Sequence, residues 1–92
     1  MAVKVYIPTP FRRGTNNKDK VEVEATDVGQ LLDRLEADWS GLKGLVRNER
    51  GEVHHHVNIY VNSEGIEALR GLDTPLKDGD EVAIIPALAG GR

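Results

Sequence analysis

The sequence predicts an α+β fold, in which one main helix packs on one face of a sheet. Several short stretches alternate apolar and polar side chains with the period of a β-strand. A single stretch near residue 30 instead places apolar residues at helical spacing. The predicted order is strand, strand, helix, strand, short helix, strand, without an internal repeat or a linker. We therefore expect a single domain at residues 1–86 and a flexible C-terminal tail at 87–92.

The first two strands are predicted to form a hairpin with a long connection. Val3, Val5 and Ile7 occupy alternate positions, so they share one face of the first strand, which residues 8–10 (Pro-Thr-Pro) end. The alternation returns at residues 21–25 after a stretch rich in turn-forming residues.

The main helix is predicted to begin after Asp27. Asp27 stands three residues before Gln30, which is the spacing of an N-cap residue and an amide at the third helical position. One helical face then carries the apolar residues Val28, Leu31, Leu32 and Leu35. The helix should end before the Ser-Gly pair at 40–41.

The second half of the chain predicts two further strands. Residues 53–61 form the third strand, residues 62–65 a turn and residues 66–69 a short helical turn. The Asp-Gly-Asp sequence at 78–80 predicts a turn that leads into a final strand at 81–86.

Composition excludes several classes of function. The net charge is −3, with 12 Lys and Arg against 15 Asp and Glu, so we expect no nucleic-acid partner. The absence of cysteine excludes disulfides, thiolate metal sites and a cysteine nucleophile, and it fits a cytoplasmic protein. The N-terminus lacks the apolar stretch of a signal peptide, and the longest apolar run contains Pro86, so we expect no membrane partner.

Nothing in the sequence predicts catalysis by this chain. No nucleophile and base occur at a recognisable spacing, so we expect no catalytic residue. On an extended strand His54 and His56 would share one face and could chelate a metal. No third ligand is evident, so we expect no metal site and keep a His54–His56 metal-binding domain as an alternative.

Phe11 is predicted to be an exposed aromatic in the connection of the first hairpin. Its neighbours are Pro10, Arg12 and Arg13, which offer little local packing. An exposed aromatic in a loop is a candidate anchor for a partner, with packing within the loop as the alternative reading. Trp39, just past the helical stripe, is expected to be a partly buried element of the core.

The chain ends in a glycine pair, Gly90-Gly91, followed by Arg92. Two glycines make a thin tail that can enter a narrow cleft, because no Cβ obstructs the approach of another backbone. Terminal disorder alone would also explain such a pair.

Two segments together resemble the MoaD/ThiS family of ubiquitin-like sulfur carriers. They are VNIYVN at 57–62 and LKDGDEVAIIPALAGG at 76–91. Residues 3–10 and 35–38 are most similar to the CysO-type carriers of cysteine biosynthesis. The resemblance implies the β-grasp fold, with a mixed sheet of four to five strands and one main helix on one face.

The resemblance also implies what the tail does. An E1-like enzyme would use ATP to adenylate the carboxylate of Gly91, and sulfide or a persulfide would displace AMP to leave a thiocarboxylate. Gly90, Ala89, Leu88 and Pro86 would thread and aim the tail. The carrier itself would bind no cofactor. Its other partners would be a PLP-dependent cysteine synthase, as sulfur acceptor, and a JAMM-type metalloprotease.

Arg92 departs from the family pattern, in which the second glycine is the last residue. The resemblance suggests a precursor that a JAMM-type protease cleaves between Gly91 and Arg92, unless Arg92 is a leftover of cloning. The other carrier functions left open are a molybdopterin-synthase small subunit, a thiamine or tRNA-thiolation carrier and a ubiquitin-like protein modifier. A β-grasp interaction module is an alternative of a different class.

Overall fold

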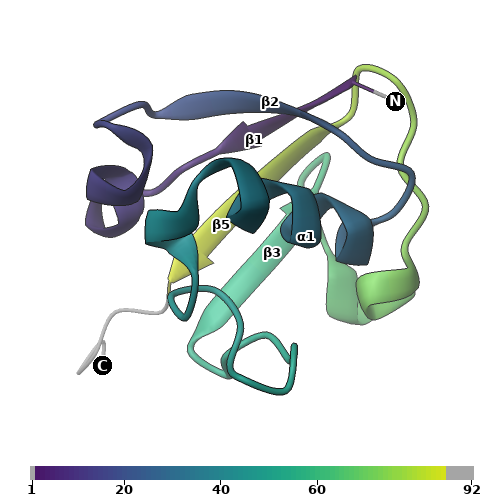
Figure 1. The fold of residues 1–92 in the computed structure, drawn as a ribbon. Helices are drawn as coiled ribbons and strands as arrows, with labels where there is room; N and C mark the ends of the chain where they lie inside the picture. The colour runs from purple at the N-terminus through teal and green to yellow at the C-terminus, as the bar shows by residue number, and fades with distance from the viewer. Residues whose placement is uncertain (1, 87–92) are drawn as a thin grey trace.

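The structure is a computed structural model and describes residues 2–86. A sheet of five strands, ordered β2-β1-β5-β3-β4, lies against the helix α1 (Figure 1). The strands are β1 (Ala2–Tyr6), β2 (Lys20–Glu24), β3 (Val57–Val61), β4 (Glu64–Gly65) and β5 (Glu81–Pro86). The helices are α1 (Val28–Asp38) and four short 3-10 helices, η1 (Thr9–Thr15), η2 (Ser40–Leu42), η3 (Ile66–Ala68) and η4 (Gly71–Asp73).

The last strand of the chain occupies the middle of the sheet. β5 runs parallel to β1 on one side and antiparallel to β3 on the other. The first two strands pair antiparallel, as the hairpin prediction requires. The α+β class, the mixed sheet and the single main helix on one face are confirmed.

The core lies between the sheet and α1. Alternate residues of the three middle strands, among them Val5, Ile59 and Val82, are buried on the face that α1 covers. All four apolar residues of the predicted helical stripe are also buried. The N-cap prediction is confirmed, because the backbone N–H of Gln30 donates to the Asp27 carboxylate at 2.7 Å.

Two segments differ from the prediction in the second half of the chain. β3 begins at Val57 rather than at 53, and residues 54–56 form a turn before it. Residues 64–65, expected within a turn, pair with the end of β3 as β4. The reversal is a two-residue turn at Asn62 (φ 49°) and Ser63 (φ 75°), both left-handed, which is the backbone a tight hairpin needs.

Two glycines permit the close contact of η1 and η2. A Cβ placed on Gly41 would lie 2.9 Å from the Cα of Gly14, a distance at which the two backbones would have to move apart. This contact brings η1 against the end of the helical segment, although about 26 residues separate the two in sequence.

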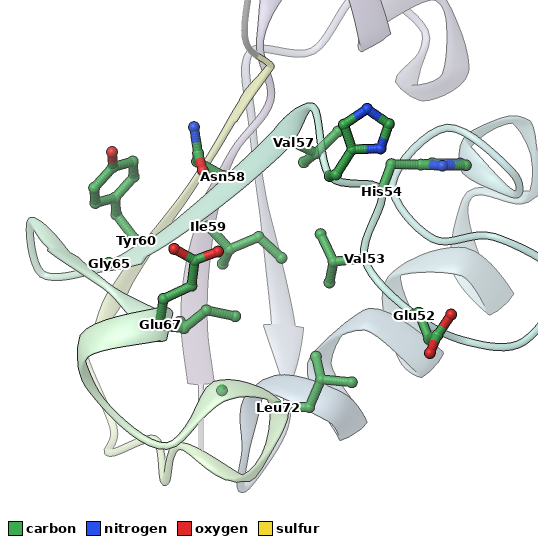
Figure 2. Close-up of a pocket in the computed structure, with 13 residues that line it drawn as sticks. Glu52, Val53, His54, Val57, Asn58, Ile59, Tyr60, Gly65, Glu67 and Leu72 are labelled. Atoms are coloured by element: carbon green, nitrogen blue, oxygen red, sulfur yellow. The ribbon is translucent and has the colours of Figure 1, made fainter.

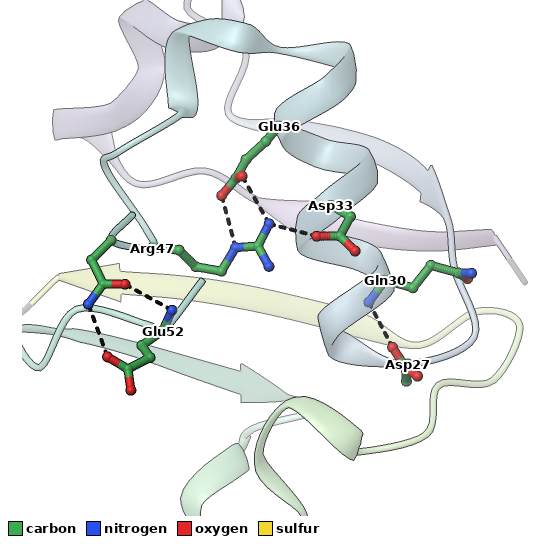
Figure 3. A network of polar contacts seen from close by, with 7 residues as sticks. Asp27, Gln30, Asp33, Glu36, Arg47 and Glu52 are labelled. Atoms are coloured by element: carbon green, nitrogen blue, oxygen red, sulfur yellow. Dashed lines mark hydrogen bonds and ion pairs between the residues drawn. The ribbon is translucent and has the colours of Figure 1, made fainter. Parts of the chain in front are cut away.

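An ion-pair network attaches the connection between η2 and β3 to the main helix (Figure 3). The Arg47 guanidinium makes two hydrogen bonds to the Glu36 carboxylate, at 3.1 and 2.9 Å, and one to Asp33 at 2.8 Å. Only 12% of the Arg47 side chain is exposed, so these carboxylates replace water around a largely buried charge. No helix among residues 2–86 is long and apolar enough to cross a membrane.

Candidate functional site

The tail is attached to the end of the central strand. Pro86, the last residue of β5, lies opposite Val57, the first residue of β3. The other residues predicted to take part, Leu88, Ala89, Gly90, Gly91 and Arg92, lie outside the described residues. The described part of the site is therefore the point of departure of the tail and the surfaces next to it.

The register explains why proline is tolerated at this point of the central strand. Asn62 donates its backbone N–H to the Glu81 carbonyl at 2.8 Å, and hydrogen-bonded pairs alternate along an antiparallel ladder. The Val57–Pro86 pair is therefore non-hydrogen-bonded, and the N–H that proline lacks would point away from β3. On that side β1 pairs with β5 only as far as Ala83. Pro86 consequently removes no bond from the ladder and fixes φ where the strand ends.

The start of β5 is fixed by hydrogen bonds between the two sequence segments that suggested the family. The Asn62 side chain donates to the Asp80 carboxylate at 2.9 Å and accepts the backbone N–H of Glu81 at 3.0 Å. The other carboxylate oxygen of Asp80 accepts the backbone N–H of Lys77 at 2.8 Å. These bonds lower the pKa of Asp80, with the Asn62 amide as the largest cause. Asn62 and Asp80 thus form a connection that sequence reasoning did not predict.

The Asp-Gly-Asp turn also holds the beginning of β1. Asp78 accepts the backbone N–H of Ala2 at 2.9 Å, and Gly79 donates to the Ala2 carbonyl at 2.9 Å. Gly79 has a φ of +89°, a conformation that favours glycine. The turn predicted at 78–80 is confirmed, and it sets β5 in register with its parallel neighbour β1.

The sheet face opposite α1 carries an apolar surface next to the departure point of the tail. Tyr6, Tyr60, Ala83 and Ile85, which we call the outer patch, line a shallow hollow of about 270 Å³. Tyr6 is 38% exposed and Ile85 is 47% exposed, which is unusual for large apolar side chains. Ile85 directly precedes Pro86, so the outer patch adjoins the end of β5. The signal for it in the sequence is the pair of isoleucines at 84–85, because one of two consecutive strand residues must face outward.

The histidines do not have the geometry predicted for a metal site. His54 and His56 lie in a turn rather than on an extended strand, and their rings stack with centroids 5.1 Å apart. One ring nitrogen of His54, Nε2, lies 2.9 Å from the Gly44 carbonyl, so it holds the preceding loop. Residues 2–86 contain no group of three or more His, Asp or Glu side chains that could hold a metal.

The prediction that Phe11 is exposed and anchors a partner is wrong. Residues 9–15 form η1, in which the Phe11 backbone N–H donates to the Pro8 carbonyl at 2.9 Å. The Phe11 side chain is 8% exposed and belongs to the hydrophobic core. Its burial depends on the packing of η1, which the local sequence does not reveal. Trp39 is partly buried against the core, as predicted.

Comparison with known proteins identifies the family. A family model described as the ThiS family matches residues 5–91. The chain belongs to the ThiS family. This ThiS-family chain is 40% identical over 93 residues to the sulfur carrier protein CysO of Mycobacterium tuberculosis, covering 99% of this chain and 100% of the relative. It is 44% identical over 94 residues to small archaeal modifier protein 3 of Haloferax volcanii, with coverages of 99% and 100%.

A solved structure has the same fold as this ThiS-family chain. It is a chain of the Amycolatopsis orientalis BexX/CysO complex, with a TM-score of 0.89 and 37% sequence identity. The match covers 97% of this chain and 99% of that chain. The ubiquitin-like β-grasp fold and the similarity to CysO-type carriers are therefore confirmed.

Proposed function

We propose that this chain is a sulfur carrier whose working group is the carboxylate of Gly91. One observation carries the proposal: the family match extends to residue 91 and so includes the glycine pair. Relatives that match over the whole length are named sulfur carrier proteins, which supports the same role here.

The chemistry proposed for Gly91 needs no catalytic group from the carrier. In an E1-like enzyme the Gly91 carboxylate attacks the α-phosphate of ATP, which forms an acyl adenylate and releases pyrophosphate. Sulfide then attacks the carbonyl carbon, and AMP leaves as the thiocarboxylate forms. A persulfide would instead displace AMP to give an acyl disulfide, and a thiol would then attack the outer sulfur, forming a disulfide and releasing the thiocarboxylate. ATP is bound by the activating enzyme, and the carrier supplies the reacting end.

We further propose that the sulfur goes to cysteine biosynthesis. The acceptor would be an activated serine in a PLP-dependent synthase, and a JAMM-type metalloprotease would release the cysteinyl product. The resemblance to the CysO protein of Mycobacterium tuberculosis supports this assignment.

The β-grasp domain would act as a rigid base from which the tail reaches into partner enzymes. A fully extended stretch at 87–92 spans about 20 Å, with Pro86 aiming it and Leu88, Ala89 and Gly90 threading the cleft. The outer patch would dock the activating enzyme and the acceptor enzyme, because it is apolar, exposed and adjacent to Pro86. The structure of the related CysO in complex with BexX supports the use of partner proteins.

Arg92 requires a maturation step in this proposal. A JAMM-type protease cleaves the peptide bond between Gly91 and Arg92, and the carboxylate of Gly91 becomes free for adenylation. Mass spectrometry of the protein from its native cells tests this step. A pool that carries sulfur and still contains Arg92 would contradict it.

The decisive experiment combines the chain that ends at Gly91 with its activating enzyme, ATP and a sulfur source. The intact mass should increase by the difference between one sulfur and one oxygen. The Gly91→Ala variant should lose loading, whereas Arg34→Ala, an exposed substitution on α1, which covers the sheet face opposite the outer patch, should keep it. Equal loading of all three proteins, or loading of none, would refute the proposal.

A second candidate function is protein modification, favoured by the 44% identity to the Haloferax volcanii modifier protein. In that reaction a lysine amine attacks the carbonyl carbon of adenylated Gly91, AMP leaves and an amide bond forms. Peptide mapping distinguishes the two functions, because a modifier leaves a branched peptide with Gly91 joined to a lysine.

A further inference from the structure

The strand β3 has an open edge beside β4. β4 contains only two residues and pairs with Tyr60 and Val61 of β3. Residues 57–59 of β3 therefore have no strand partner on that side among residues 2–86. Unpaired strand edges are the places at which another chain can add to a sheet.

The register identifies the backbone groups that face this edge. The hydrogen bond from the Asn62 N–H to the Glu81 carbonyl shows that the backbone groups of Asn62 point toward β5. The direction of these groups alternates from one residue to the next along the strand. The backbone groups of Tyr60 and Asn58, which lie two and four residues before Asn62, also point toward β5. Ile59 points the other way, so its N–H faces the open edge, whereas its carbonyl faces the continuation of β4, because it flanks the non-hydrogen-bonded pair of Tyr60 and Gly65. Val57 presents only a carbonyl there, because its N–H donates to the His54 carbonyl at 2.9 Å.

An apolar hollow of about 330 Å³ lies beside this edge, and we call it the edge groove (Figure 2). The side chains of Val53 and Leu72 line it and are only half-buried. Ile59 and Ile66 contribute buried apolar side chains to it. The edge groove therefore offers an apolar side chain a place next to the N–H of Ile59 and the carbonyl of Val57.

The edge groove carries negative charge. Exposed Glu52 and Glu67 line it, and Figure 2 places them on different sides of the apolar residues. His54 and His55 also line it, but neither lysine nor arginine does so within the described part of the chain. An incoming segment with basic residues would complement these two carboxylates.

We propose that the edge groove binds an extended basic segment of a partner protein, which adds to the sheet as a strand beside β3. Its backbone donates to the Val57 carbonyl and accepts the Ile59 N–H, as a parallel strand would, an apolar side chain packs against Val53 and Leu72, and flanking Lys or Arg residues meet Glu52 and Glu67. This mode of recognition takes its affinity from main-chain hydrogen bonds and its selectivity from alternate side chains. The open edge lies on the side of β3 that faces away from β5, the strand that leads into the tail.

An NMR titration of the ¹⁵N-labelled full chain tests the proposal. The probe is the peptide acetyl-Lys-Val-Ile-Val-Lys-amide, and the control is the same peptide with Glu in place of Lys. The basic peptide should shift the Ile59 amide resonance and slow its hydrogen exchange, whereas the acidic peptide should bind at least about threefold more weakly at low salt.

Two matched comparisons separate strand addition from loose attraction. Methylating the central backbone nitrogen of the peptide that would donate to the Val57 carbonyl should weaken binding about tenfold, and methylating those that face away should not. The Glu67→Lys variant should weaken binding about threefold or more, while Glu22→Lys on the distant strand β2 should not. Shifts confined to the outer patch, no shift at Ile59, or equal effects of the two methylation patterns would overturn the proposal. None of these outcomes bears on sulfur loading at Gly91, so the two proposals fail separately.

Discussion

Replacing Asn62 should show how much the connection between β3 and β5 contributes to stability. Asn62→Ala removes the hydrogen bonds to the Asp80 carboxylate (2.9 Å) and from the Glu81 N–H (3.0 Å). Both bonds are exposed, so each is worth about 0.5–1 kcal/mol, near the low end of the usual range. Residue 62 is left-handed (φ 49°), a conformation that costs alanine about 1 kcal/mol more than glycine. The expected loss is therefore about 2–3 kcal/mol for Asn62→Ala.

Asn62→Gly separates the two contributions. Glycine removes the same side-chain hydrogen bonds but adopts the left-handed conformation without strain, so it should cost about 1–2 kcal/mol. Asn58→Ala on the same strand is the matched control, because Asn58 is exposed, and it should change stability by less than about 0.5 kcal/mol.

Urea unfolding followed by circular dichroism measures all three variants. The free energies should rank wild type and Asn58→Ala together, then Asn62→Gly, then Asn62→Ala, with unchanged dependence on urea concentration. If Asn62→Ala and Asn62→Gly were equally stable, the left-handed backbone would carry no cost. If both matched the wild type, the hydrogen-bonded connection would not stabilise the fold, and our reasoning would be refuted.

Three further predictions follow from the described residues. Gly41→Ala should destabilise the fold by about 1–3 kcal/mol in the same urea assay, because the alanine Cβ would lie 2.9 Å from the Cα of Gly14. An unchanged midpoint of unfolding would show that η1 and η2 can move apart without cost. Ile85→Glu should leave the melting temperature within about 3 °C of the wild-type value, because this side chain is 47% exposed. The same variant should reduce sulfur loading, and normal loading would exclude the outer patch as a docking surface. The pKa of Asp80 is lowered in the folded protein, so its contribution to stability is present above the unfolded value of about 3.9 and is lost as pH falls through the folded value. Acid unfolding of Asp80→Asn should consequently depend less on pH below about 4 than that of the wild type, and parallel curves would contradict this.

The sequence predicted the strands and the helix in which buried apolar residues recur at the spacing of that element. The strands at the two ends of the chain and the helix α1 each bury one face, so the alternation and the stripe at Leu31, Leu32 and Leu35 identified them correctly. The last strand, predicted at 81–86, has these bounds in the structure. The Asp-Gly-Asp turn was predicted because glycine there has the positive φ that such turns use.

The errors concern residues whose surroundings come from distant parts of the chain. Phe11 is buried because η1 packs against η2 through Gly14 and Gly41, a contact that no local pattern encodes. The connection before β3 is ordered by Arg47, whose partners lie on α1. The bonds from Asn62 to Asp80 and Glu81 join segments about 18 residues apart, and the sequence motif revealed the residues but not their contact.

The position of β5 has a consequence for the order in which the protein is made. β1 and β3 do not pair with each other; each pairs with β5, so the sheet stays in two pieces until the final strand is available. During synthesis β5 leaves the ribosome after all other strands, and the segment that follows it is the tail. A chain that ends early therefore lacks both the strand that joins the sheet and the glycine pair at 90–91. Under the proposed function the same stretch of sequence would both complete the fold and supply the reacting end, so incomplete chains would have nothing for an activating enzyme to load.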